Sequence, residues 1–358
     1  MHNITNIVMV NDLQSLSKQI LSDICIDLSL DDSGNKADLV MKIQDYINEN
    51  TDIVLPNRVN NYLLAGQTSC KWYRLNQRVE EQTLVEKITN DLSFNPFLEI
   101  NVPSIESIKA TPLIVSAGKG EDTNKIYIRY IYRSGIAQKA HGNTIQPVAY
   151  TTTSTVVIYL KEKLIEVRGN TRKASTIVEE LTRTLNLQVS VEEVRAPFEG
   201  DIEDIADRLE GVFIDARSKT DLVFDEFDED NVTAIAAVLE GIDDFFETSD
   251  SSKLNESLYA AQEAFDKQSF SIPFSALVLS GMDQVGLASE SELRDLPLFS
   301  YLRPQLAPHT GFIKFNFTEN GLKKSYTIQV GKSTKSINFK TPVSEEVIDY
   351  VKDKIIVD

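Results

Sequence analysis

Residues 125–133 read KIYIRYIYR, and this run decides the fold of the middle of the chain. β-Branched and aromatic side chains dominate it, which favours a strand over a helix. Three similar runs bounded by turn residues are ATPLIVSA (110–117), TTSTVVIYL (152–160) and KLIEVRG (163–169). The residues KEK (161–163) predict a tight hairpin between the last two runs. A helix should follow, with a buried side made of Ile177, Val178, Leu181 and Leu185. We therefore expect an α+β fold with an antiparallel sheet.

The C-terminal portion returns to strands. GFIKFNF (311–317), KKSYTIQV (323–330) and SINFK (336–340) predict a β-meander, and SEEVIDYVKDKI (344–355) predicts a closing helix. At the other end, SCKWYRL (69–75) predicts a strand and residues 78–92 a helix. The polar stretch before them, residues 51–68, contains a proline and predicts a linker.

Charge is distributed unevenly along the chain. The net charge is -18, but residues 199–298 hold 25 acidic and 6 basic side chains, so this segment carries the whole excess of acid. Residues 109–183 hold 12 basic and 6 acidic side chains. A basic middle followed by an acidic segment bears on partners, not on fold. The sequence predicts five parts: 1–50, 51–68, 69–198, 199–298 and 299–358.

Helical spacing of apolar residues near the start predicts two helices. Leu13, Leu16, Ile20, Leu21 and Ile24 indicate a first helix over about residues 12–24, and an extended CIDLSL (25–30) should follow it. Asn35 is a plausible N-cap with Asp38 three positions later, as a capping box requires. Leu39, Ile43 and Tyr46 or Ile47 would form the buried stripe of the second helix.

This helix-extended-helix pattern over residues 12–48 resembles the SAP module, which occurs mostly in DNA-handling proteins. The matching residues are Leu16, Leu21, Leu30, Gly34, Lys36, Leu39, Lys42 and Ile43. The resemblance implies that Lys36 and Lys42 contact DNA phosphates, and that Ser33, Gly34 and Asn35 offer hydrogen-bond donors at a positive helix end. The module has few bases and several nearby aspartates, so the contact should be weak and salt-sensitive. The alternative is a helical docking module that makes no DNA contact.

The strand at 125–133 offers a second candidate surface. If Ile126, Ile128, Tyr130 and Tyr132 share the buried face, the other face displays Tyr127, Arg129, Ile131 and Arg133. Alternating aromatic and arginine side chains can stack bases and hold phosphates. They can equally form a half-exposed face on which arginine stems cover apolar surface. Further members of such a basic patch are Lys161, Lys163, Arg168, Arg172 and Lys173.

The acidic segment 199–298 is expected to be mostly helical. Apolar stripes in residues 200–213, 230–247 and 251–266 leave opposite faces rich in carboxylates. Such faces could be plain solvated surface, a docking surface for a basic protein partner or for a basic face of the same chain, or a mimic of nucleic acid. DLVFDEFDED (221–230) lacks the central glycine and final glutamate of a calcium loop, so no calcium site is predicted.

No catalytic constellation stands out. His2, His141 and His309 lack a Ser, Cys or carboxylate partner at a telling spacing. SAGKGED (116–122) lacks the features of a phosphate loop and predicts a turn, and Glu166-Val-Arg168 is only an approximate nuclease motif. Cys25 and Cys70 are expected to be reduced thiols. We expect no metal and no cofactor.

These patterns predict a cytoplasmic protein without a membrane segment that acts as a non-catalytic DNA-binding subunit. Contacts to the DNA would come from the SAP-like module and the basic sheet, and a protein partner could dock on the acidic segment 199–298. The alternative is a protein-protein interaction subunit of a larger complex, with no role for nucleic acid.

Overall fold

The computed structural model of the chain shows two compact units, Met1–Glu210 with Phe315–Asp358, and Gly211–Lys314. The structure describes residues 1–50, 55, 57–120, 122, 124–141, 143–185, 190–219, 238, 252, 255–256, 258–259, 274–280, 284–289, 292–295, 310–319 and 321–357. None of the described helices is both long and apolar enough to cross a membrane. The first unit takes in the predicted N-terminal module, linker and middle domain together.

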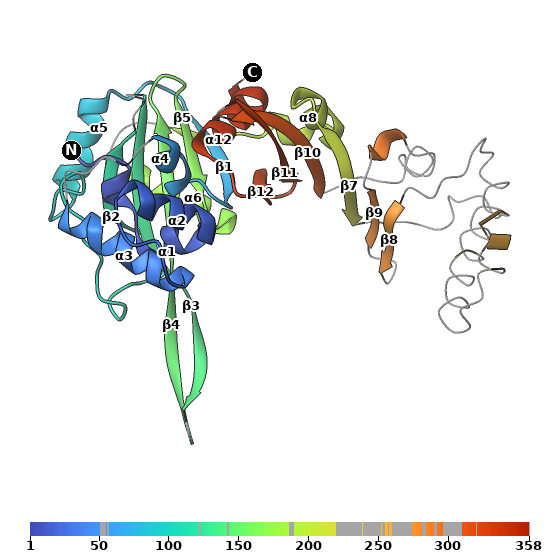
Figure 1. The fold of residues 1–358 in the computed structure, drawn as a ribbon. Coiled ribbons are helices and arrows are strands. Elements are labelled where there is room, and N and C mark those ends of the chain that lie inside the picture. Colours follow the sequence, from blue (N-terminus) through green and yellow to red (C-terminus); the bar gives the residue numbers. More distant parts are fainter. Residues whose placement is uncertain are drawn as a thin grey trace. The chain divides into compact units, whose positions relative to one another are not determined.

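An antiparallel sheet forms the framework of the first unit (Figure 1). Its strand order is β2-β3-β4-β5-β1-β12-β11-β10, with β10 contributing residues 315–319, and β6 also pairs with β1. The strands are β1 (Ser69–Leu75), β2 (Leu113–Lys119), β3 (Lys125–His141), β4 (Thr144–Tyr159), β5 (Leu164–Arg168), β6 (Val191–Glu193), β10 (Thr310–Glu319), β11 (Leu322–Gly331) and β12 (Ser336–Phe339). This confirms the predicted α+β class, the 161–163 hairpin and the C-terminal strands.

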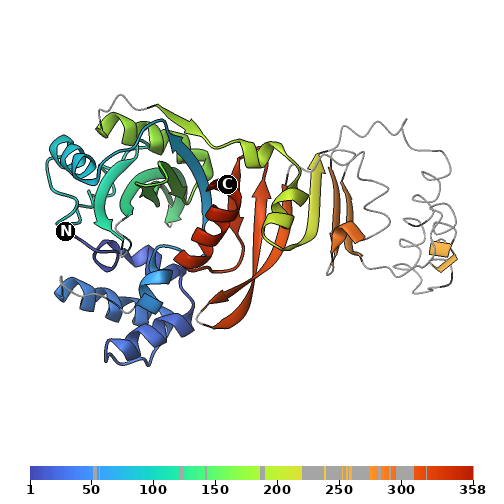
Figure 2. The same cartoon turned by 90° about the horizontal axis from the view of Figure 1, so that it is seen from above.

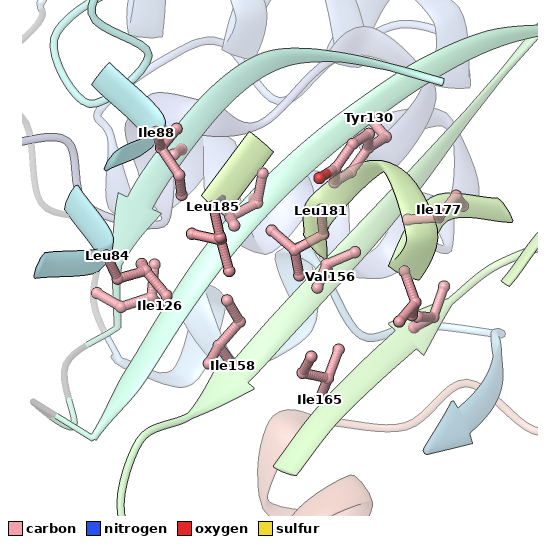
Figure 3. Close-up of a cluster of buried hydrophobic side chains, with 14 of the residues drawn as sticks. Leu84, Ile88, Ile126, Tyr130, Val156, Ile158, Ile165, Ile177, Leu181 and Leu185 are labelled. Atoms are coloured by element: carbon pink, nitrogen blue, oxygen red, sulfur yellow. The ribbon is translucent and has the colours of Figure 1, made fainter. Parts of the chain in front are cut away.

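Two helices cover one face of this sheet. They are α5 (Glu81–Asp91) and α6 (Ala174–Leu185), both at predicted positions. Figure 3 shows their apolar side chains meeting Ile126 and Tyr130 of β3, which alternate along the strand as its two-residue period requires. Buried apolar area of this kind stabilises the fold by about 25 cal/mol per Å². The main core of the unit therefore lies between this helix pair and the sheet.

The opposite face of the same strands is covered as well. Tyr127 of β3 donates a hydrogen bond to Glu345 at the start of α12 (Glu345–Lys352). Arg129 donates to Asp12 of the N-terminal helices, and Ile131 packs beside Met9. Figure 2 shows the N-terminal helices, in blue, along one side of the curved strands. The sheet is therefore the middle of three layers.

The N-terminal helices differ in detail from the prediction. The expected single helix over 12–24 is two helices, α1 (Val10–Ser15) and α2 (Lys18–Asp27), because Ser17 starts a new helix by accepting a hydrogen bond from the Ile20 amide. The expected extended link 25–30 is also shorter. Helix α2 continues to Asp27 and closes through Ser29, whose φ of 58° is left-handed, with the Leu30 amide donating to the Cys25 carbonyl at 2.7 Å. Helix α3 (Lys36–Glu49) begins where predicted.

The described residues between 55 and 68 are not the predicted linker. They include α4 (Asn57–Leu63), whose Val59 and Leu63 side chains are buried. Buried Asn60 accepts a hydrogen bond from the Thr5 hydroxyl at 2.8 Å and donates to the Leu55 carbonyl at 2.8 Å. This buried amide ties the segment to the start of the chain, which the polar composition of the stretch did not indicate.

The second unit contains strands within a segment that was expected to be mostly helical, although no individual helix was predicted over 274–280 or 284–289. The order is β10-β7-β9-β8, formed by residues 310–314 of β10 with β7 (Val212–Lys219), β9 (Gln284–Ser289) and β8 (Phe274–Ser280). The helical stripe predicted through residue 213 ends earlier, because α8 (Ile202–Arg208) stops and Glu210 takes a left-handed φ of 50° before β7. The helices predicted over 230–247 and 251–266, and the run 221–230, lie almost wholly outside the described residues. The short elements are η1 (Thr5–Ile7), η2 (Thr171–Lys173), α7 (Ala196–Glu199), η4 (Leu293–Asp295) and η5 (Asp353–Val357).

Candidate nucleic-acid interface

The start of α3 has the capping geometry that the sequence predicts. The Asn35 side chain accepts hydrogen bonds from the amides of Ala37 and Asp38, at 2.8 and 3.1 Å, and the Asp38 carboxylate accepts from the Asn35 amide at 2.9 Å. Gly34 has a φ of 118°, and a Cβ there would lie 2.9 Å from the Asp38 carboxylate. A glycine is therefore required at this turn. Ser33, Gly34, Asn35 and Lys36 are all exposed.

Lys42 is engaged inside this module. Its ammonium donates to the Asp31 carboxylate at 2.6 Å and to the carbonyls of Asp31 and Ser33 at 3.0 and 2.8 Å. Ser33 donates its hydroxyl to the same carboxylate at 2.7 Å. The predicted phosphate ligands Lys42 and Ser33 thus fasten the loop before α3. Lys36 keeps the exposed position at the first turn of the helix.

The Lys42 contact makes a testable prediction about Asp31. The hydrogen bond from Lys42, helped by Ser33, lowers the pKa of the Asp31 carboxyl well below its usual range. In Lys42→Met we expect this pKa to rise toward the ordinary value of about 3.9, measured by NMR titration. A lowered folded-state pKa contributes stability that is present above the ordinary pKa and is lost as pH falls, so the variant should lose this acid dependence. Lys36→Met is the control, and an unchanged Asp31 pKa in Lys42→Met would contradict the contact.

The structure contradicts the prediction that the basic face of β3 is open to nucleic acid. Tyr127, Arg129 and Arg168 are buried, each with an exposed fraction of 2% or less. Arg129 donates to both carboxylate oxygens of Asp12, at 2.7 and 2.6 Å, and also contacts the Thr155 hydroxyl. The Tyr127 hydroxyl donates to Glu345 at 2.9 Å. These side chains cannot reach a nucleic acid, because the N-terminal helices and α12 cover the face that the sequence leaves open.

Arg168 belongs to a buried network of charges beneath α12. It donates to Glu166 at 2.5 Å and, through two nitrogens, to Glu345, one of these bonds measuring 2.9 Å. Glu166 also accepts from the Trp72 indole at 2.8 Å. Burial raises the pKa of Glu345, but the Arg168 charge outweighs burial and holds the pKa below its ordinary value. The arginine therefore balances two buried carboxylates and attaches α12 to the sheet.

Neighbouring groups complete this network without forming a metal site. Lys125 pairs with Asp349 of α12, and the pKa of Asp349 is raised, chiefly by burial. Within the described residues no group of three His, Cys, Asp or Glu side chains could hold a metal ion. The approximate nuclease motif Glu166-Val-Arg168 is thus occupied by ion pairs that hold the fold.

The remaining predicted bases do not form a single patch. Lys161 and Lys163 are exposed in the turn before β5, whereas Arg172 and Lys173 lie in η2 after it. Five residues of β5 separate the two pairs, which is about 17 Å of extended chain. Arg133 lies half-buried where β3 leaves the sheet. The patch is therefore divided between the two ends of β5.

The structure adds an element that the sequence did not predict. Strands β3 and β4 continue as a two-stranded hairpin beyond their predicted ends, with pairs running from Gly135↔Tyr150 to His141↔Thr144. We call residues 134–150 the arm; Figure 1 shows it projecting from the sheet. Among the described residues, no other strand pairs with it. Its predictive signal is weak, because neither face is buried and the apolar positions do not alternate cleanly.

A surface cleft of about 580 Å³ lies elsewhere in the first unit, lined by residues that include Asp23, Tyr62 and Lys324. Glu319 gathers the polar groups beside it, accepting from the Tyr62 hydroxyl at 2.6 Å and from Lys324 at 2.5 Å. These polar groups are thus paired with one another, as in a structural cluster.

No known protein family has a model that matches the chain, and no curated protein matches its sequence. The SAP resemblance of residues 12–48 stays a prediction.

Proposed function

We propose that this protein is a non-catalytic DNA-binding subunit that contacts the phosphate backbone through the start of α3. The observation that carries the proposal is the exposed, glycine-dependent turn from Ser33 to Lys36, with Lys36 at the first position of a fourteen-residue helix. A lysine at a positive helix end suits a phosphate, and Lys36 carries the contact because the capping box already occupies the amides of Asn35, Ala37 and Asp38. Asp31 and Asp38 stand nearby, so the affinity should be modest and strongly salt-dependent.

The proposal includes a protein partner and a cytoplasmic location. A subunit that holds DNA without chemistry of its own acts with a separate enzyme or scaffold. The acidic segment 199–298 would supply the docking surface, since its 25 carboxylates would repel DNA and attract a basic protein. Arg172 and Lys173 lie in η2 before α6, so they would make phosphate contacts separate from those of α3.

A second candidate is a protein-protein interaction subunit without nucleic acid. The observation that favours it is the exposure of Ile136 and Ile145 on the arm, at 60% and 67%. Apolar side chains displayed together often mark a protein interface. Retention of one protein partner by the purified chain, with no DNA binding at low salt, would support this candidate over the first.

The charge of Lys36 gives a matched mutational test. Lys36→Glu is expected to weaken binding to a DNA duplex by about three-fold or more at about 50 mM salt, and to flatten the salt dependence, because one phosphate contact is lost. Fluorescence anisotropy at about 50 and 200 mM salt, with single- and double-stranded DNA, measures both effects.

Lys18→Glu is the control for this test. Lys18 is also an exposed lysine at the first position of a helix, and an acidic residue is tolerated at either helix start. Both variants should fold, and only Lys36→Glu should lose affinity. Equal affinity of Lys36→Glu and the unaltered protein would remove the start of α3 from the DNA interface.

A further inference from the structure

The arm has a composition unlike the rest of the protein. Residues 123–161 contain no Asp or Glu, although the chain has 54 of them and a net charge of -18. The buried strand residues in this range would exclude carboxylates in any protein. The arm itself is different, because none of its described side chains is buried. An exposed element without acid, carrying Lys139 and with Arg133 at its base, is suited to an anionic partner.

The strand register sorts the arm's side chains onto two faces. Directly opposed residues of an antiparallel pair share a face. One face carries the pairs Ile136↔Ala149, Gln138↔Pro147 and Ala140↔Ile145, and the other carries Gly135↔Tyr150, Ala137↔Val148 and Lys139↔Gln146. The first face is uncharged and apolar except for Gln138. The second presents a lysine and an amide together with exposed Tyr150 and smaller apolar groups.

This chemistry matches the groove of a DNA duplex. On the face with Ile136 and Ile145, the Gln138 amide can pair with base edges, and isoleucine can contact thymine methyl groups. Lys139 has a long stem that can turn toward a phosphate. A two-stranded ribbon fits the major groove, which is about 12 Å wide, better than the minor groove of about 6 Å. Seven residues of each strand give a reach of about 23 Å, enough to cross that groove.

We propose that the arm lies in the major groove of duplex DNA, with its Ile136 and Ile145 face toward the bases and Lys139 toward the backbone. The inference rests on the proposed DNA-binding function, and it names the element that would enter the duplex. The start of α3 would then supply further phosphate contacts. The absence of carboxylates would also suit a second copy of this acidic chain. The width of the two-stranded ribbon and its Gln138 amide favour DNA, and the oligomeric state of the armless variant tests the other occupant.

An armless variant tests the proposal in the full chain. Residues 136–149 are replaced by Asn-Gly, a two-residue turn that can join Gly135 to Tyr150, which are already paired. Because the arm adds no buried side chain, the variant should keep its circular-dichroism spectrum and melting temperature. We expect its affinity for a duplex of about 20 base pairs to fall about ten-fold or more. Lys139→Glu should reduce the salt slope by about one, and Lys139→Arg should not.

The possible outcomes distinguish failure of the arm proposal from failure of the proposed DNA-binding function. Loss of affinity in the armless variant, together with competition by the major-groove ligand methyl green and not by the minor-groove ligand netropsin, supports the proposal. Equal affinity of armless and unaltered protein overturns it and leaves the DNA-binding function standing. No binding by the unaltered protein at low salt overturns both. A change from dimer to monomer on arm removal, with unchanged DNA affinity, would identify the arm as a contact between copies and overturn the proposal.

Discussion

Replacing Arg168 by methionine is expected to lower the free energy of unfolding by about 3–5 kcal/mol. Methionine has a similar length, so the loss does not come from a large cavity. It comes from Glu166 and Glu345, two buried carboxylates that would lose their shared counter-charge. Urea unfolding followed by circular dichroism measures the change. Arg172→Met, at an exposed arginine four residues later, is the control and should leave stability within about 0.5 kcal/mol.

The pH dependence of this loss can be given a sign. The pKa of Glu345 is held below its ordinary value by Arg168 against the effect of burial. This pair therefore contributes stability above the ordinary glutamate pKa of about 4.3, and the contribution is lost as pH falls through the folded-state value. In Arg168→Met, Glu345 should take up a proton, so the gap between the two proteins should narrow in acid. Stability equal to the unaltered protein at neutral pH would show that the network contributes nothing.

The sequence predicted the sheet well because strand composition is a local property. KIYIRYIYR, TTSTVVIYL and KLIEVRG became neighbouring strands, and helices formed at 81–91 and 174–185, close to the predicted positions. The Asn35 capping box was also correct, since all its contacts lie within four residues. Local patterns suffice for such elements.

The candidate site was predicted less well because exposure is not local. Arg129 alternates with tyrosine and isoleucine in a way that suits either a nucleic-acid surface or a buried ion pair. Its partner Asp12 lies 117 residues earlier, and nothing in the strand identifies it. In the sequence, Lys42 likewise gives no sign that its ammonium is already paired with Asp31. The SAP-like residues indicate where Lys36 begins a helix, but not which of their charges are already paired.

The acidic segment 199–298 shows a second limit of prediction from sequence. Its acidic composition suggested a mostly helical segment, but residues 212–219, 274–280 and 284–289, of which only 212–213 fell within a predicted helix, are strands. The middle strand β9 receives hydrogen bonds from β7 and β8 on its two sides, and β8 follows β7 only after a long intervening stretch. The runs FSALVLS and QVGLAS contain no carboxylate, so the acidic composition of the whole segment did not indicate these two strands.

Replacing Asp12 by alanine is expected to cost about 3 kcal/mol or more of the free energy of unfolding, because Arg129 would be left buried without its carboxylate partner. Asp12 also accepts a hydrogen bond from the Met9 amide at 2.8 Å, so part of the loss is a lost helix cap. Asp38→Ala isolates that part, since Asp38 holds the same position at the start of α3 and is exposed. It should cost only about 1 kcal/mol.

The difference in lost free energy of unfolding between Asp12→Ala and Asp38→Ala measures how strongly the N-terminal helices are attached to the sheet. In Asp12→Ala, hydrogen exchange should quicken in α1 and in the middle of β3, where Arg129 lies, while α5 and α6 remain protected. If both variants lost the same free energy of unfolding, the Asp12–Arg129 ion pair would not stabilise the fold. The N-terminal helices would then fold as a separate module, as the sequence predicted. A larger loss in Asp12→Ala means that the start of α3 is held by the same sheet that carries the arm. The N-terminal helices and the sheet that carries the arm would then act as one folded unit.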